Sequence, residues 1–392
     1  MLNIYFLRLA LVLALVPSVN FSLNSLDTQP LAAILAIICL AFAAKTRFPV
    51  KIWYLALPAV ASLMIAVTSS TLAVGLRGIV IYSSPWIFAC MAYMASQRNI
   101  KIDKYIIFMI YLWAAIGLVQ WLIDPRIFEF LVNTRTTDNR GVTSLAPEPS
   151  FYGLTILQMW LTLLLIQPQI ALKRHIVMLC IFQIFILAQS TLAILVLGAV
   201  FLIFALTSII SSLSVLAGIL TLFLMIESEV GANTRFFVLL GTFLNDPSQI
   251  LYADGSISER FYHVFLSLKE AISSGLVPHG FDAFAEVIAQ GQDQYDSYWW
   301  GEIVNKIMSG IGGAVFEMGW FSLIFFFVFY IYLSRYEIIS HFHKLVIGIG
   351  IFCVLLNSVT FATPYFGIMI GIMAAQINAS LKLKAIFDFG RT

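Results

Sequence analysis

One short stretch of the chain combines arginines, a constrained carboxylate and a predicted helix start. Arg135 and Arg140 lie in a polar segment that leads into Pro-Glu-Pro-Ser at 147–150. The two prolines restrict the residues before them and hold Glu148 in an extended turn. Ser150 is predicted to cap the following helix, whose N-terminus would favour an anion. The pattern indicates a phosphate site; a loop whose arginines touch lipid headgroups is the alternative.

Arg260 and His279 form a second candidate group. Arg260 lies near the start of a predicted helix, where the positive end of the dipole disfavours a cation. A phosphate partner would resolve that conflict, although a surface arginine in solvent fits equally well. His279, within Pro278 to Phe281, could act as acid or base because imidazole changes charge near neutral pH. A solvated loop histidine is the alternative.

Glu317 and Arg77 are ionisable residues within predicted membrane helices. Placing such a group in a bilayer costs on the order of 2.5 kcal/mol or more, which makes it a functional candidate. The alternative is that the two are structural partners of each other.

Patterns for metal and nucleotide chemistry do not occur in the sequence. It contains no Asp-x-Asp pair, no GxxxxGK[ST] phosphate loop and no His or Cys spacing suited to a metal. The four cysteines lie in apolar runs and are expected to be buried thiols. We therefore expect no metal, no cofactor and no nucleic-acid partner.

Composition places these residues in a membrane protein. Of 392 residues, 61% are hydrophobic and 11% charged, whereas about a quarter are charged in soluble domains. We predict an all-α polytopic bundle of about 12 transmembrane helices, since a span needs roughly 20 mostly apolar residues. The predicted spans are Ile4–Val19, Leu31–Ala44, Ile52–Thr68, Leu72–Ala95, Tyr105–Ile123, Phe151–Gln167, Ile176–Gln189, Thr191–Ser208, Leu213–Ile226, Val304–Leu333, Leu345–Val359 and Phe366–Leu381.

Basic residues in the short connections predict the orientation, because Lys and Arg concentrate on the cytoplasmic side. They fall on one side only if 176–210 is divided into two helices at Gln189-Ser190. Both termini are then cytoplasmic. The residues concerned are Lys45, Arg47, Lys51, Arg98, Lys101, Lys104, Lys173, Arg174, Arg335, Lys344, Lys382, Lys384 and Arg391.

Two outer connections, 124–150 and 227–302, are too long to be simple turns. The predicted organisation is nine membrane helices over 1–226, a large periplasmic loop over 227–302, and three further helices with a cytoplasmic C-terminus over 303–392.

The large loop contains a predicted helix. Ser256 and Glu259 form a capping box, and Gly275 ends the helix. Apolar residues recur at helical spacing between them: Phe261, Phe265, Leu268 and Ile272. The loop ends in aromatic residues that predict an interfacial belt, with sugar stacking as the alternative: Tyr295, Tyr298, Trp299 and Trp300.

These residues, in this order, resemble the O-antigen polymerase (Wzy) and O-antigen ligase superfamily. Arg140-Gly141 followed by Glu148-Pro149-Ser150 is similar to an Arg-Gly…Glu-Pro-Ser element of that family. Ser258-Glu259-Arg260 with Pro278 to Phe281 is similar to its Ser-x-Arg…Pro-(Leu/His)-Gly-x-Gly loop element. Glu317-Met318-Gly319 is similar to the Glu-x-Gly that follows the loop.

The chain also departs from the family pattern. Ser190-Thr191 stands where many members carry Ser-Arg. The ligase branch carries a histidine before the tenth helix, whereas this chain reads Asn305-Lys306-Ile307-Met308-Ser309. The absence of that histidine favours the polymerase branch over the ligase branch and leaves the base unassigned.

The resemblance implies a GT-C-like protein of the bacterial inner membrane with a periplasmic active site. Its expected activity is metal-independent transfer of a glycan from undecaprenyl pyrophosphate onto a lipid-linked repeat unit. Expected partners are the lipid-linked donor and acceptor, membrane lipids and a chain-length regulator protein.

The implied roles divide the candidate residues into two groups. The pyrophosphate would be bound by Arg140 and Arg260, with Arg135 and Arg77 as further candidates. Glu148 is the first candidate for the base, and His279 and Glu317 are the others.

Two other functions remain open. A ligase to lipid A core would differ only in its acceptor. A transporter or flippase would carry charges deep in several helices, whereas here they cluster at one face.

Overall fold

The computed structural model describes residues 2–19, 30–42, 46–132, 134–135, 141–205, 235–295, 303, 305–357 and 359–389. Within these ranges the regular structure is entirely helical. The predicted all-α class is therefore confirmed. Several predicted features lie outside the described residues: Arg140, the helix Leu213–Ile226, Tyr298, Trp299, Trp300, and the domain boundaries at 226 and 302.

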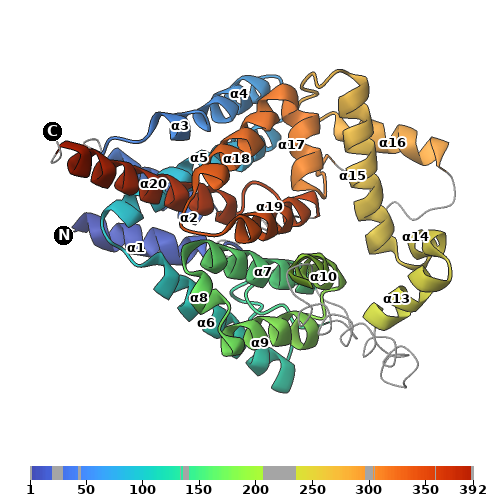
Figure 1. Cartoon of the computed structure of the whole chain (residues 1–392). Coiled ribbons are helices and arrows are strands. Elements are labelled where there is room, and N and C mark those ends of the chain that lie inside the picture. Colours follow the sequence, from blue (N-terminus) through green and yellow to red (C-terminus); the bar gives the residue numbers. More distant parts are fainter. Residues whose placement is uncertain are drawn as a thin grey trace.

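The chain forms the following elements (Figure 1). They are α1 (Leu2–Ala14), α2 (Leu31–Ala41), α3 (Val50–Trp53), α4 (Ala56–Ala66), α5 (Leu72–Gln97), α6 (Ile102–Leu122), α7 (Pro149–Ile166), α8 (Pro168–Ala171), α9 (Arg174–Phe182), the π-helix η1 (Gln183–Leu187), α10 (Thr191–Ala205), α13 (Arg235–Asn245), the 3₁₀ turn η2 (Pro247–Gln249), α14 (Ile250–Ala253), α15 (Gly255–Ser273), α16 (Phe284–Gln294), α17 (Gly310–Met318), the 3₁₀ turn η3 (Gly319–Ser322), α18 (Leu323–Arg335), α19 (His341–Leu356) and α20 (Tyr365–Phe389).

Four helical stretches in the described ranges are long and apolar enough to cross a membrane. They are Leu72–Gln97, Ile102–Leu122, Pro149–Ile166 and Gly310–Arg335. Shorter apolar helices pack around them, including α1, α2, α10 and α19. These lengths and compositions are those of a helical membrane protein.

The predicted division of 176–210 into two helices is confirmed for the described part. Helix α9 continues into the π-helical turn η1, and α10 starts afresh at Thr191. Gln189 has the left-handed φ of 45° that breaks the helix. The Ser190 hydroxyl then accepts the Ala193 N–H at 3.2 Å, as an N-cap residue does.

Two other predicted spans are interrupted. Ile52–Thr68 divides into α3 and α4, and the tenth span divides into α17 and α18 around η3. Gly319, at the second break, has φ 54° and ψ −131°. A side chain there would clash with the backbone carbonyl of Leu276, so glycine is required where the loop meets the broken helix.

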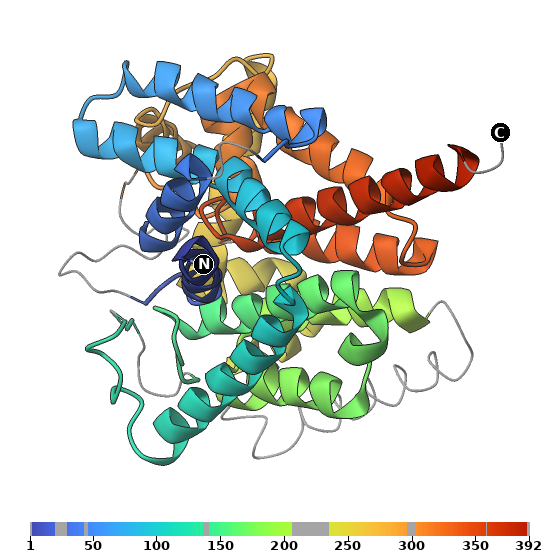
Figure 2. The same ribbon diagram turned by 90° about the vertical axis from the view of Figure 1, so that its left-hand side faces the viewer.

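One end of the bundle collects most of the basic connections. There the end of α7 meets the start of α6, where Gln167 Nε2 donates to Asp103 at 3.0 Å. Tyr336, just after α18, donates to the Leu165 carbonyl at 3.3 Å. Figure 2 looks onto this end, with α13 to α16 behind the bundle. The described basic residues of the short connections lie beside these helix ends: Arg47, Lys51, Arg98, Lys101, Lys104, Lys173, Arg174, Arg335 and Lys344.

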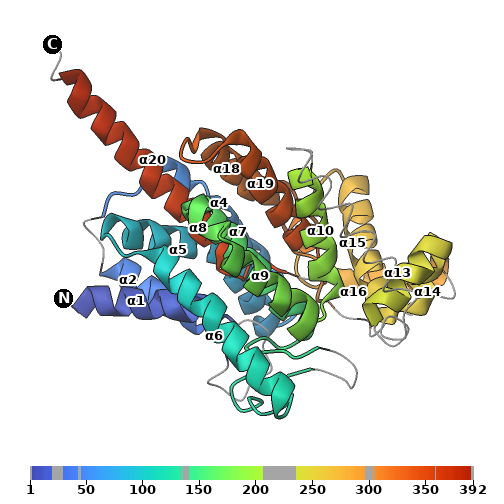
Figure 3. The ribbon, with the colours of Figure 1, turned by 60° about the horizontal axis from the view of Figure 1, so that its bottom comes forward.

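Helices α13 to α16 form a group at the opposite end (Figures 1 and 3). Helix α15 connects this group to the bundle by packing against α17. Helix α15 begins at Gly255, and the Asp254 side chain accepts the Ile257 N–H at 3.0 Å. The predicted capping box of Ser256 and Glu259 is thus wrong, because the carboxylate of Asp254, two residues before Ser256, caps the helix. Gly275, with φ 69°, follows its C-terminus as predicted.

Helices α5 and α20 pack closely through small residues, as membrane helices do. A Cβ at Gly371 would clash with the backbone carbonyl of Ala89. We expect Gly371→Ala to destabilise the protein by about 1–3 kcal/mol, the usual cost of overpacking. The measurement is the unfolding midpoint of purified protein in detergent. Gly198→Ala is the matched control, because no atom lies within 4 Å of its Cβ position, and an equal effect of both substitutions would contradict the packing argument.

Candidate functional site

The candidate site forms where the first turn of α7 meets α15. Glu148 occupies the N-cap position with φ −140° and ψ 154°, the predicted extended turn, and Pro149 is the first helical residue. The Glu148 side chain makes no capping bond. Ser150 does not cap the helix as predicted, because the helix begins one residue before it. Its hydroxyl instead donates to Glu148 Oε2 at 3.2 Å.

Two guanidinium groups reach Glu148 from different elements. Arg135 Nη2 lies 3.3 Å from Glu148 Oε1, and Arg260 Nη2 lies 3.6 Å from Glu148 Oε2. Arg260 Nη2 also donates to Ser150 Oγ at 3.5 Å. The structure thus brings Arg260, from the second candidate group, to Arg135 and Glu148 of the first. The carboxylate is partly exposed, with 23% of its side chain accessible, so a ligand can reach it.

The segment before Glu148 is buried although it is not helical. Residues 141–147 are all buried, and Ser144 has a left-handed φ of 49°. Such backbone must find its hydrogen-bond partners within the protein. Gln120, in α6, supplies two of them: its Oε1 accepts the Ser144 N–H at 2.5 Å and its Nε2 donates to the Ser144 carbonyl at 3.3 Å.

The π-helical turn supplies another partner. In η1 the Ala188 N–H bonds to the Gln183 carbonyl, a five-residue step. This wider turn leaves the Leu187 carbonyl to accept the Val142 N–H at 2.7 Å. A side chain at Gly141 would clash with the Ala188 carbonyl, which explains the glycine of the Arg-Gly pair. π-Helical turns often occur at functional positions.

Arg77 and Glu317 form a separate cluster with Tyr82. Arg77 Nη2 lies 3.8 Å from Glu317 Oε1, and the Tyr82 hydroxyl donates to Glu317 Oε2 at 2.6 Å. Arg77 also donates to the Asn305 carbonyl at 3.2 Å. The contacts match the structural-partner interpretation of Arg77 and Glu317. They do not bring Arg77 to Glu148.

His279 belongs to the connection between α15 and α16. Its ring stacks on Phe316 at 4.4 Å, and its backbone N–H donates to the Phe316 carbonyl at 3.1 Å. Gly280 donates to the Glu317 carbonyl at 3.4 Å. The connection therefore binds backbone carbonyls at the end of α17, and His279 contacts that helix rather than Glu148.

Sequence analysis missed two residues that build these clusters. Gln120 and Tyr82 are both buried in membrane helices. A polar side chain in an apolar span is the signal that could have identified Gln120, since such groups need a partner within the protein. Tyr82 gave no comparable signal, because tyrosine is common in membrane helices.

His263 connects α15 to the segment before α17 and to α16. Its Nδ1 accepts the Met308 N–H at 3.0 Å, and its ring meets Phe284 edge-on at 5.2 Å. Burial lowers the pKa of His263 to about 4. The imidazole is therefore neutral at pH 7, as its role as an acceptor requires.

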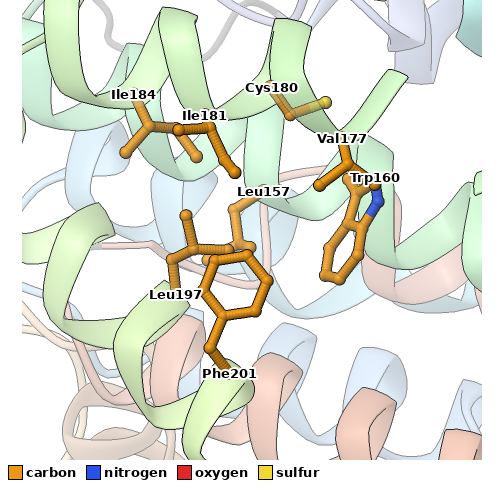
Figure 4. Close-up of a pocket in the computed structure, with 8 residues that line it drawn as sticks. All are labelled: Leu157, Trp160, Val177, Cys180, Ile181, Ile184, Leu197 and Phe201. Carbon is orange, nitrogen blue, oxygen red and sulfur yellow. The ribbon is translucent and has the colours of Figure 1, made fainter. Parts of the chain in front are cut away.

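A small cavity lies away from these charged groups, among α7, α9 and α10. It has a volume of about 10 Å³, roughly the space of one water molecule, and is lined mainly by aliphatic and aromatic side chains (Figure 4). Trp160 turns its indole N–H away to the Ala171 carbonyl at 3.1 Å. A cavity with these walls cannot bind a charged group, so we place the candidate site at Glu148.

The sequence matches no protein-family model and no curated protein. Function is therefore inferred from the residues and their geometry.

We expect Gln120→Leu to destabilise the protein by about 1–3 kcal/mol, because it leaves the buried N–H and carbonyl of Ser144 without partners. Unfolding in detergent measures the loss. Gln120→Glu keeps the acceptor for the Ser144 N–H, so it should lose less than Gln120→Leu. Equal stability of Gln120→Leu and the unmodified protein would show that the hydrogen bonds between Gln120 and Ser144 do not stabilise the fold.

Burial of neutral His263 makes stability depend on pH. Because its folded pKa is about 4 and the unfolded value is about 6.5, the unfolded state binds more protons between these values. Stability should fall as pH drops from about 6.5 towards 4, by up to on the order of 3 kcal/mol. Unfolding midpoints at several pH values measure this. His263→Gln should flatten the profile, whereas His175→Gln, at an exposed position, should not.

Proposed function

We propose that the protein is a polysaccharide polymerase of the Wzy type. It would transfer a growing glycan from undecaprenyl pyrophosphate onto the terminal sugar of a lipid-linked repeat unit. The observation that carries the proposal is a single accessible carboxylate, Glu148, contacted by two arginines at a helix N-terminus. The resemblance of the motifs to the polymerase branch supports the same function.

The proposed reaction is a displacement at an anomeric carbon. The acceptor hydroxyl oxygen forms a bond to that carbon while the bond to the pyrophosphate oxygen breaks. The hydroxyl proton passes to the Glu148 carboxylate, which acts as general base. The electron pair of the broken bond leaves with the pyrophosphate.

Arg135 and Arg260 would stabilise the charge that develops on the leaving group. A guanidinium carries five N–H donors, so one arginine can contact a carboxylate and a phosphate oxygen together. Charge-assisted hydrogen bonds of this kind are the stronger class, and donors already in place lower the barrier. Arg140, which lies outside the described residues and directly precedes Gly141, is proposed to join them.

The orientation of the bundle supports a periplasmic site. Basic residues gather at the end opposite Glu148, and the side rich in Lys and Arg is normally cytoplasmic. We propose the twelve-helix topology in a bacterial inner membrane, with 227–302 as a periplasmic loop and both termini in the cytoplasm.

The Arg77–Glu317 cluster is proposed to hold the site together. It joins α5 to the end of α17, to which the loop carrying His279 is bonded. The Glu317 side chain is only 6% exposed, whereas that of Glu148 is 23% exposed and can be reached by a substrate. Glu148 is therefore the better candidate for the base than Glu317 or His279.

The test is transfer by purified protein with synthetic lipid-linked repeat units. We expect Arg260→Ala to lower the polymerisation rate by about 100-fold or more, as loss of one charge-stabilising donor does. Arg126→Ala is the matched control, because Arg126 lies in the same outer connection as Arg135 and its contact with Glu129 is largely exposed.

Three results would contradict the proposal. Full rate and polymer length from Arg260→Ala would remove Arg260 from the mechanism. Transfer only to lipid A core would identify a ligase, and flux of lipid-linked substrate across proteoliposomes without any change in chain length would identify a flippase.

A further inference from the structure

Two basic residues, Lys51 and Arg335, lie at the same end of neighbouring helices. Helices α4 and α18 are in contact and lie near one another in Figure 1. A Cβ at Gly280 would lie 3.9 Å from Ile65, at the end of α4, and Gly280 bonds to the Glu317 carbonyl shortly before α18 begins. The two helices therefore run in opposite directions. Lys51, at the start of the α3–α4 segment, and Arg335, at the end of α18, thus come to the same end.

The charges of these two residues repel each other. Burial, and then the charge of Arg335, lower the pKa of the Lys51 ammonium from its ordinary value. Neither side chain forms an ion pair with a carboxylate in the described part of the chain. Two like charges with no carboxylate between them raise the electrostatic energy. An anion that contacts both side chains would lower it.

Two further cations belong to the same two segments. Lys344 Nζ donates to the Ser334 carbonyl at 2.8 Å, which places its ammonium at the end of α18. The Arg47 carbonyl accepts the Tyr93 hydroxyl at 3.5 Å, so the backbone just before α3 is held against α5. The four cations therefore come from segments that are far apart in the sequence and that backbone contacts hold in place.

The cations lie where the lipid-facing surface ends. On α18, Phe327 and Tyr330 are exposed. Trp53 and Tyr54, close to Lys51, are also exposed, and both residue types collect at the membrane–water interface. This order of apolar residues, aromatic residues and cations matches the hydrocarbon, interface and headgroup layers of a bilayer. The exposed apolar residues of α4 that follow Lys51 recur at helical spacing: Leu57, Val60, Leu63 and Met64.

An anionic phospholipid matches both parts of this surface. Its phosphate complements Lys51 and Arg335, because ammonium and guanidinium groups form charge-assisted hydrogen bonds with phosphate oxygens. Its acyl chains match the exposed apolar faces of α4 and α18. Basic pockets between membrane helices commonly bind such headgroups. A soluble phosphate would use the cations alone and would leave the adjoining apolar surface uncovered.

We propose that Lys51 and Arg335 bind the phosphate of an anionic phospholipid whose acyl chains lie along the exposed faces of α4 and α18. Arg47 and Lys344 flank the headgroup and favour a lipid with a net negative charge over a zwitterionic one. The site lies at the end of the bundle opposite Glu148, so it does not rest on the proposed polymerase function.

The experiment measures lipid binding by the full chain in detergent with native mass spectrometry. The probes are phosphatidylglycerol, which is anionic, and phosphatidylcholine, which is zwitterionic. We expect the unmodified protein to bind phosphatidylglycerol more tightly. The double variant Lys51→Gln with Arg335→Gln should bind phosphatidylglycerol about tenfold more weakly, because each basic residue near an anionic headgroup adds to its attraction.

Two further double variants serve as controls. Lys101→Gln with Lys104→Gln removes the same number of charges from exposed positions at the same end of the bundle, and it should bind phosphatidylglycerol as the unmodified protein does. Lys51→Arg with Arg335→Lys keeps both charges at the proposed site and should also retain binding. Equal losses in the two glutamine variants would overturn the proposal, because the lipid would then respond only to the overall charge of this end.

Unchanged phosphatidylglycerol binding by Lys51→Gln with Arg335→Gln would also overturn the proposal. A third probe, inorganic phosphate, separates a lipid site from a site for a soluble anion. We expect it not to displace phosphatidylglycerol at equal concentration, because it cannot contact the apolar faces of α4 and α18. Full displacement would identify a soluble anion as the ligand and overturn the assignment to a phospholipid.

Discussion

The structure depends on one constraint: backbone that is not helical and is buried in a membrane bundle must find every hydrogen-bond partner within the protein. Residues 141–147 are the clearest case. Their partners come from Gln120 and from the Leu187 carbonyl left available by the π-helical turn. Because these hydrogen bonds are few and directional, they fix the backbone conformation of residues 141–147. They thereby also fix the position of Glu148, which follows the segment.

The end of α17 follows the same rule. Its last carbonyls accept N–H groups from the connection around His279, and Gly319 admits that connection to the helix break. Arg77 and Tyr82 fix the same region from α5 through Glu317. Helices α13 to α16 are therefore joined to the bundle at the end of α17. Backbone hydrogen bonds and the Arg77–Glu317 ion pair stabilise the same junction.

These two junctions place α15 beside α7. Arg260 then reaches Glu148, and the opposite face of α15 exposes parallel aromatic rings. The buried face of α15 contacts Phe316 of α17 through the cluster that contains Tyr262 and Leu266, whereas Phe261 and Phe265 are exposed.

The sequence by itself determined the class of protein. A membrane span requires a long apolar run whatever surrounds it, so hydropathy sufficed for the all-helical bundle. The positions of Lys and Arg were enough to predict the break at Gln189. A single helix over 176–210 would have placed the basic connections on both sides of the membrane. The proline pattern around Glu148 determined its extended conformation for a local reason.

Only the tertiary structure decided which polar groups meet. Arg77 pairs with Glu317, and Gln120 binds Ser144, because particular helices become neighbours. Asp254 rather than Ser256 caps α15, a choice between adjacent acceptors that the motif alone left open. The spacing of Phe261 and Phe265 identified a helix face, but the structure leaves both residues exposed and buries the neighbouring Leu266 instead. Periodicity defines a face, and only packing determines what it faces.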